Sequence, residues 1–182
     1  MNKQIVVVLA EGFEEIEAVA PIDFLRRLGI AVVVAGLNEL DVFGAHGIRI
    51  EAECSLANIK PDEVSMLVLP GGMPGAKHLR DSDLLINLIR KVYHGGGYVA
   101  AICAAPIALD RAGIIDGKRV TAYPSVETML EKAIYTGNTV EVDDRIITGK
   151  GPGAVFAFSE QLATACGKAT EAREALALMF AK

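Results

Sequence analysis

The sequence is poor in aromatic residues, cysteine and histidine. Its 182 residues include no tryptophan, 4 tyrosines, 3 cysteines and 3 histidines. The cysteines (Cys54, Cys103 and Cys166) are odd in number and widely spaced. They form neither a disulfide framework nor a CxxC metal motif, and they favour a reducing, cytoplasmic location. Because no histidine stands at ligand spacing from another, we expect no structural metal.

The sequence also lacks an excess of basic residues and a long apolar run. It has 18 Lys and Arg against 23 Asp and Glu, a net charge of −5, and therefore no basic footprint for nucleic acid. No apolar run is long enough to span a bilayer. The N-terminus enters a strand-like run directly and has no signal-peptide cleavage site. We expect neither nucleic acid nor a membrane as a partner.

The sequence is rich in aliphatic side chains. Hydrophobic residues make up 52% of it, mainly Val, Ile, Leu and Ala, which is typical of parallel sheets covered by helices on both faces. Periodicity predicts buried strands over 4–10, 30–35, 65–69 and 98–102, and helices over 14–28, 81–93, 105–112, 154–166 and from 170 onward. It also predicts a short strand over 118–123, a hairpin over 140–148, and an edge or hairpin strand near 47–51. We therefore predict an α/β fold over 1–182, a single domain with a doubly wound, mostly parallel sheet.

Cys103 falls on the hinge between a predicted strand and a predicted helix. Pro106 suits the first turn of that helix, where a missing N–H costs nothing. A sharp strand-to-helix turn exposes the side chain at its apex, lowers the pKa of a thiol there, and supplies backbone N–H groups for a developing oxyanion. The alternative is that Cys103 is a small buried apolar residue, as free cysteines usually are.

Two more segments lie at carboxyl ends of predicted strands, where open α/β sheets place their sites. The first carries Glu14, Glu15 and Glu17, and the second is the glycine-rich loop over 70–75. A carboxyl beside a thiol opposes ionisation of the thiol unless burial keeps the acid protonated, in which case the acid donates to the thiolate and can transfer protons. The alternative is that the three glutamates are ordinary acids of a first helical turn.

Four motifs occur in order along most of the chain: Glu11-Gly12-Phe13-Glu14-Glu15-Ile16-Glu17, Leu69-Pro70-Gly71-Gly72, Ala100-Ala101-Ile102-Cys103-Ala104-Ala105-Pro106 and Gly151-Pro152-Gly153. Together they resemble the ThiJ/PfpI superfamily, in the branch of the parkinsonism-associated protein deglycase and bacterial YajL. The resemblance implies a flavodoxin-like fold, no cofactor, and a homodimer with the first helix in its interface. It also implies site roles: Cys103 as the reactive cysteine, Glu17 as a protonated acid bonded to its sulfur, and the N–H groups of Gly72 and Ala104 as an oxyanion hole.

The resemblance adds a set of candidate pocket residues: Glu14, Gly71, Met73, Tyr123, Arg27, His46 and Lys150. Arg27 and His46 match positions from which the other subunit approaches the pocket, and His46 stands where arginine is common. Lys150 keeps the charge of an arginine, although a solvated loop lysine is the simpler interpretation. Tyr123 stands where the branch often has histidine, and it can donate a hydrogen bond or serve as a pocket wall.

The resemblance implies a cysteine-dependent, cofactor-independent enzyme that acts on a small aldehyde or a glycated adduct. The reaction would be glyoxalase III-like, from methylglyoxal to lactate, or protein deglycation. Ala104 replaces the histidine that follows the cysteine in the peptidase-like branch, so we do not expect a protease. The same residues would also suit a cysteine-based oxidative-stress sensor or a redox-regulated chaperone.

Overall fold

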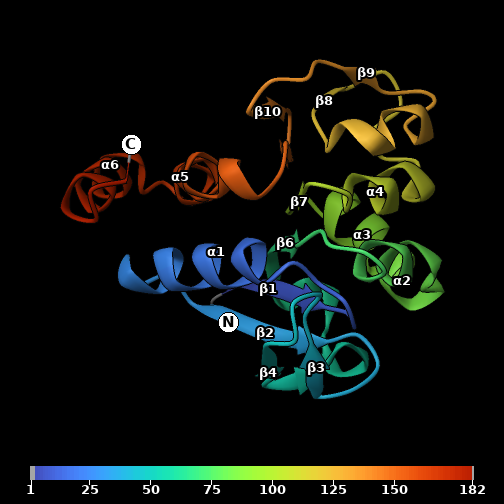
Figure 1. The fold of residues 1–182 in the computed structure, drawn as a ribbon, viewed down its shortest axis with the longest axis horizontal. Coiled ribbons are helices and arrows are strands. Elements are labelled where there is room, and N and C mark those ends of the chain that lie inside the picture. The colour runs from blue at the N-terminus through green and yellow to red at the C-terminus, as the bar shows by residue number, and fades with distance from the viewer. Residues whose placement is uncertain (1–2, 182) are drawn as a thin grey trace.

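The protein is built around a seven-stranded sheet (Figure 1). A computed structural model describes residues 3–181. We expect no signal peptide at the N-terminus, and the first two residues of that segment lie outside the described residues. The strand order is β10-β11-β7-β6-β1-β2-β5, and neighbouring strands are parallel except for the β10–β11 pair. The strands are β1 (Gln4–Leu9), β2 (Val32–Gly36), β5 (Cys54–Ser55), β6 (Val64–Leu69), β7 (Tyr98–Ile102), β10 (Val140–Asp143) and β11 (Ile146–Gly149).

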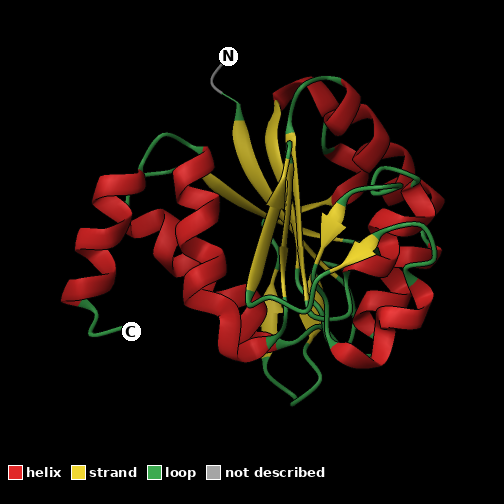
Figure 2. Ribbon diagram, turned by 90° about the horizontal axis from the view of Figure 1, so that it is seen from above, coloured by secondary structure: helices red, strands yellow, loops and turns green. Residues whose placement is uncertain are grey.

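Helices cover both faces of the sheet (Figure 2). One group consists of α1 (Glu15–Arg27), α5 (Val155–Ala165) and α6 (Ala169–Leu178), and the other of α2 (Gly75–Asp81), α3 (Asp83–His94) and α4 (Pro106–Ala112). The strands alternate between two buried clusters: Ile5 and Val7 pack with the first group, and Val6 and Val8 with the second. Because side chains along a strand point to opposite faces, the continuous apolar run of β1 serves both cores. The predicted flavodoxin-like α/β fold is confirmed.

Short elements fill the irregular regions. The hairpin β3 (Asp41–Phe43) and β4 (Arg49–Glu51) follows β2, and β8 (Arg119–Val120) pairs with β9 (Ile134–Tyr135). Single-turn or two-turn 3₁₀ helices span Leu56–Asn58, Pro61–Glu63, Pro124–Met129 and Pro152–Ala154. The sequence analysis missed α2, because its seven residues bury little beyond Ala76 and Leu79 and give too short a pattern. Between residues 3 and 181, no helix has the length and apolar character needed to cross a membrane.

The topology brings three loops together at one end of the sheet. The chain proceeds from β1 outward to β2 and β5, then returns to β6 on the other side of β1 and continues outward to β7. Because β1, β6 and β7 are parallel neighbours, the segments that follow them meet beyond their carboxyl ends, where the strand order reverses. These segments carry Glu17, Gly71 and Cys103.

Candidate active site

Cys103 occupies a strained turn between β7 and α4. Its φ of 62° lies in the left-handed region, which few residues other than glycine adopt. Its N–H donates to the Gly149 carbonyl at 2.9 Å, and its carbonyl accepts from the Tyr123 N–H at 2.8 Å. These two bonds hold the backbone in a conformation that costs about 1–3 kcal/mol elsewhere. The side chain is 9% exposed, which places the sulfur at the base of a cavity rather than on an open surface.

Glu17 lies beside the Cys103 thiol and is completely buried. It stands in the first turn of α1, with its carboxyl beside the thiol. The Gly71 N–H donates to Glu17 Oε2 at 2.8 Å, while Oε1 is buried and has no hydrogen-bond partner among residues 3–181. A Cβ at Gly71 would lie 2.6 Å from the Cβ of Cys103 and 2.7 Å from Glu17 Oε2. Glycine at this position therefore lets the three segments meet.

The local environment shifts the pKa of both reactive groups upward. Burial raises the pKa of Glu17 to about 7, although the hydrogen bonds from Gly71 and the thiol oppose the shift. Burial likewise raises the pKa of Cys103 to about 12; the charge of Glu17 and its hydrogen bond add to this, and the N–H groups of Gly72 and Ala104 oppose it. The sequence analysis expected the turn to lower the thiol pKa. The structure reverses that direction, because burial and a carboxylate outweigh two backbone N–H groups.

The two groups titrate as a pair, and the position of one proton decides which of them is charged. Because the Gly71 N–H occupies Oε2, a proton on Glu17 is expected on Oε1, the oxygen that has no hydrogen-bond partner in the described part of the chain. A proton there removes the charge that opposes a thiolate. The thiolate is therefore favoured when the proton resides on Glu17, so the two side chains can share one proton.

A cavity of about 450 Å³ opens above the sulfur. It is lined by Glu14, Gly72, Met73, Cys103, Ala104, Tyr123, Ser125, Val126, Met129 and Pro152. The motif resemblance suggests Glu14, Met73 and Tyr123 as pocket residues, and all three line the cavity. Gly71 does not line it but lies against Cys103 and Glu17. Sequence reasoning missed Val126 and Met129, whose 3₁₀ segment has no recognisable period. The one available signal was their position directly after the strand predicted over 118–123.

The remaining candidates lie outside this cavity. Arg27 ends α1 and donates to Asp23 at 2.7 Å, so within one chain it does not reach the sulfur. Lys150 donates to the Gly137 carbonyl at 2.9 Å and lines a neighbouring cavity of about 500 Å³, which shares Tyr123 and Pro152 with the first. Lys150 is therefore half-buried and hydrogen bonded to the backbone, unlike a fully solvated loop lysine.

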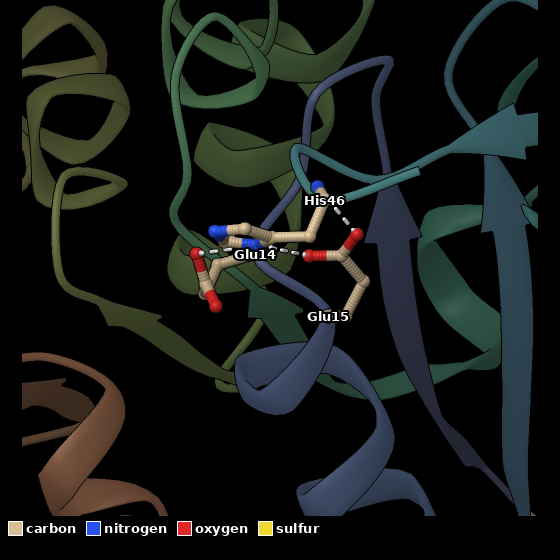
Figure 3. A group of neighbouring side chains, drawn as sticks. All are labelled: Glu14, Glu15 and His46. Atoms are coloured by element: carbon tan, nitrogen blue, oxygen red, sulfur yellow. Dashed lines mark hydrogen bonds and ion pairs between the residues drawn. The ribbon is translucent and has the colours of Figure 1, made fainter. Parts of the chain in front are cut away.

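His46 joins Glu14 and Glu15 in a cluster that sequence spacing did not reveal (Figure 3). Its Nδ1 lies 2.8 Å from Glu15 Oε2 and 3.7 Å from Glu14 Oε2, while Glu15 Oε1 accepts the N–H groups of His46 and Ile48. The ligand atoms of the three residues lie within 4.8 Å of one another, a spacing that a metal ion could use. The Glu15 hydrogen bond, aided by the charges of Glu14 and Glu15, raises the pKa of His46. When His46 is protonated, the cluster is an ion pair that ties the β3–β4 loop to α1.

The site thus combines a buried thiol, a buried carboxyl beside it, and two backbone N–H groups beside the sulfur. No histidine lines the Cys103 cavity in the part of the chain that the structure describes. The arrangement suits addition of sulfur to an electrophilic carbonyl, followed by short-range proton transfer. It offers no Cys–His dyad.

Comparison with known proteins places this chain in a family. The sequence profile of the DJ-1/PfpI family matches residues 3–165. The chain is 40% identical over 166 residues to protein dj-1beta of Drosophila melanogaster, covering 90% of this chain and 89% of that protein. The crystal structure of that Drosophila protein superposes with a TM-score of 0.95, at 37% identity over 100% of both chains. An oxidized DJ-1 from Toxoplasma gondii matches with a TM-score of 0.91, at 31% identity over 98% of each chain. The ordered motifs, the fold and these similarities agree, and the chain belongs to the DJ-1/PfpI family.

Proposed function

We propose that the protein converts small 2-oxoaldehydes to 2-hydroxy acids, using Cys103 as nucleophile and Glu17 as proton carrier, without a cofactor. The observation that carries this proposal is the buried Glu17 carboxyl beside the Cys103 thiol, whose Oε2 accepts the Gly71 N–H and whose Oε1 has no hydrogen-bond partner among the described residues. A carboxyl with a pKa of about 7 is suited to accept and return protons near neutral pH.

The first step is addition of the sulfur to the aldehyde carbon of methylglyoxal. The thiol proton passes to Glu17 as the carbon–sulfur bond forms, and the aldehyde oxygen becomes an oxyanion. The N–H groups of Gly72 and Ala104 stabilise this oxygen until Glu17 passes the proton on to it, which completes a hemithioacetal and leaves Glu17 as the carboxylate. The negative charge is shared throughout between sulfur, carboxyl and the reacting oxygen, so no second charge is buried.

The second step moves hydrogen between the two substrate carbons. The carboxylate form of Glu17 removes the proton from the hemithioacetal carbon, giving an enediol, and returns a proton to the neighbouring carbon. The first carbon is oxidised to a thioester and the second is reduced to an alcohol, so no external oxidant is needed. Water then cleaves the thioester, releasing lactate and regenerating the thiol. Glyoxal would give glycolate by the same steps, and an early glycation adduct that carries the same carbonyl chemistry is a substrate of the same class.

Lactate formation from methylglyoxal by the purified protein, in the absence of glutathione, tests this proposal. We expect turnover by the wild type and none above background with Cys103→Ser. Cys166→Ser, at a half-buried thiol outside the cavity, is the matched control and should keep full turnover. Full turnover by Cys103→Ser would refute the proposal.

A second function, peroxide sensing at Cys103, is favoured by the same hydrogen-bond donors. Two equivalents of hydrogen peroxide would take the thiol through sulfenic to sulfinic acid, releasing two waters. The Glu17 O–H would then donate to a sulfinate oxygen. Cys54 and Cys166 are free thiols that do not line the Cys103 cavity, and they serve as internal references. Intact mass and peptide mapping after mild peroxide should find two oxygens on Cys103 alone, and equal oxidation of the three thiols would exclude a special sensor.

The three free thiols also fit the cytoplasmic location that we propose.

We also propose that the protein is a homodimer through α1. An apolar groove of about 390 Å³ runs along this helix, with Ile16, Val19, Ile48, Phe156 and Met179 in its lining. Ile16, Val19 and Ile48 are exposed in the single chain, as an apolar face that awaits a partner would be. Sedimentation analysis should find a dimer for the wild type and a monomer for Val19→Glu. A wild-type monomer at micromolar concentration would refute this arrangement, including the approach of Arg27 to the site of a second subunit.

A further inference from the structure

We propose that the Cys103 cavity prefers 2-oxoaldehydes with an apolar substituent of aromatic size over methylglyoxal. This inference rests on the proposed function and names its substrate class. Its basis is the size and chemistry of the space around the sulfur.

The cavity is much larger than methylglyoxal requires. Its volume of about 450 Å³ lies within the range of about 300–1,000 Å³ that is typical of pockets for drug-sized ligands. A water molecule in the liquid takes about 30 Å³, so a molecule of a few heavy atoms leaves most of the space to solvent. Tyr123 and Pro152 also line the neighbouring cavity, which extends the space beyond the sulfur. A substituent of aromatic size would fill the part of the cavity that the methyl group of methylglyoxal leaves to water.

The chemistry of the lining favours an apolar substituent. At the base, the sulfur and the N–H groups beside it can form hydrogen bonds, and Glu14 and Ser125 add a carboxylate and a hydroxyl to the lining. Farther out, Met73, Tyr123 and Met129 line the cavity and are 57%, 47% and 40% exposed. An apolar ring that covers these side chains removes their apolar surface and its own from water, whereas a methyl group is too small to do so. Methionine is unbranched and adapts its shape, so two methionines at the rim can accommodate rings of different outline.

The kcat/KM for phenylglyoxal relative to that for methylglyoxal tests this preference. We expect the wild type to favour phenylglyoxal by at least about tenfold, as for a hydrophobic pocket that gains apolar contacts. The double variant Met73→Ser/Met129→Ser should lower this ratio about tenfold. The matched control Leu84→Ser/Leu178→Ser changes two exposed apolar side chains on α3 and α6, outside the cavity, and should keep the wild-type ratio.

A second readout does not depend on turnover. The rate of Cys103 alkylation by iodoacetamide is compared with the rate for its N-phenyl analogue, each divided by the rate for a free small-molecule thiol. We expect the phenyl reagent to be favoured in the wild type and in the control but not in the Met73→Ser/Met129→Ser protein. Turnover of methylglyoxal with equal substrate ratios in all proteins would overturn this inference and leave the proposed function intact. Equal alkylation ratios in all proteins would overturn this inference as well. Absence of all turnover would refute the proposed function and, with it, this inference.

Discussion

Replacing Glu17 by glutamine should stabilise the protein, and increasingly so as the pH rises from about 4.5 to about 7. Glutamine keeps the shape of the side chain, an oxygen that can accept the Gly71 N–H and an amide that can donate to the sulfur. It removes the ionisation of a fully buried carboxyl. The pKa of Glu17 is raised from 4.5 to about 7 in the folded protein, so the folded state binds more protons than the unfolded state between these values. The free energy of unfolding of the wild type therefore falls across this range, and the glutamine variant lacks that loss.

The size of the effect follows from the same two pKa values. At about 1.4 kcal/mol per pKa unit, the change from 4.5 to about 7 corresponds to about 3 kcal/mol of stability lost to ionisation of Glu17. We expect the difference in unfolding free energy between Glu17→Gln and the wild type to be small at pH 4.5. It should approach this value above pH 7 and then level off.

Urea unfolding at a series of pH values measures this difference. Glu174→Gln, at an exposed position on α6, is the matched control and should show no comparable rise. A difference between Glu17→Gln and the wild type that stays constant from pH 4.5 to 7.5 would refute the reasoning, because it would mean that folding does not perturb the Glu17 pKa.

Three further predictions concern the residues around the pair. Gly71→Ala should lower the unfolding free energy by about 1–3 kcal/mol and slow Cys103 alkylation, because its Cβ would overlap Cys103 and Glu17. Gly153→Ala has open space around its added Cβ and should change neither quantity. Equal effects of the two substitutions would contradict the packing argument. Cys103→Gly should be more stable than Cys103→Ala by about 1 kcal/mol in thermal or urea unfolding, because glycine relieves the strain of φ 62°; the opposite order would exclude strain at this turn. The imidazole of His46, followed by NMR titration, should have a pKa above 6.5 that falls in Glu15→Gln, and an unchanged value would show that the ion pair does not form in solution.

The main strands and the reactive cysteine were predictable because their signals are local. Aliphatic runs with glycine or proline at their ends predicted β1, β6 and β7, and the abrupt change from strand to helix pattern marked Cys103. The rule that sites lie beyond the carboxyl ends of strands then brought Cys103 and Glu17 to one place. The motif resemblance supplied the role of Glu17, which the residue pattern alone left open to ordinary helix capping.

The parts that escaped prediction depend on contacts distant in sequence. Glu15 and His46 are 31 positions apart, and the hairpin that joins them lies in an irregular region. Met129 reaches the cavity from a 3₁₀ segment whose residues show no period. The direction of the Cys103 pKa shift depends on burial and on the charge beside it, and neither follows from the position of a residue on a turn.

Lactate formation by Glu17→Gln, measured together with alkylation of its Cys103, tests the central claim that the two side chains act as a proton-exchanging pair. The account predicts that this variant keeps a thiol that iodoacetamide can alkylate but loses turnover of methylglyoxal by at least about a hundredfold, as removal of a general acid–base does. Glu174→Gln, assayed beside it, should match the wild type in both readouts. Turnover by Glu17→Gln within about threefold of the wild type would contradict the account, because the proton would then move between the substrate carbons without Glu17.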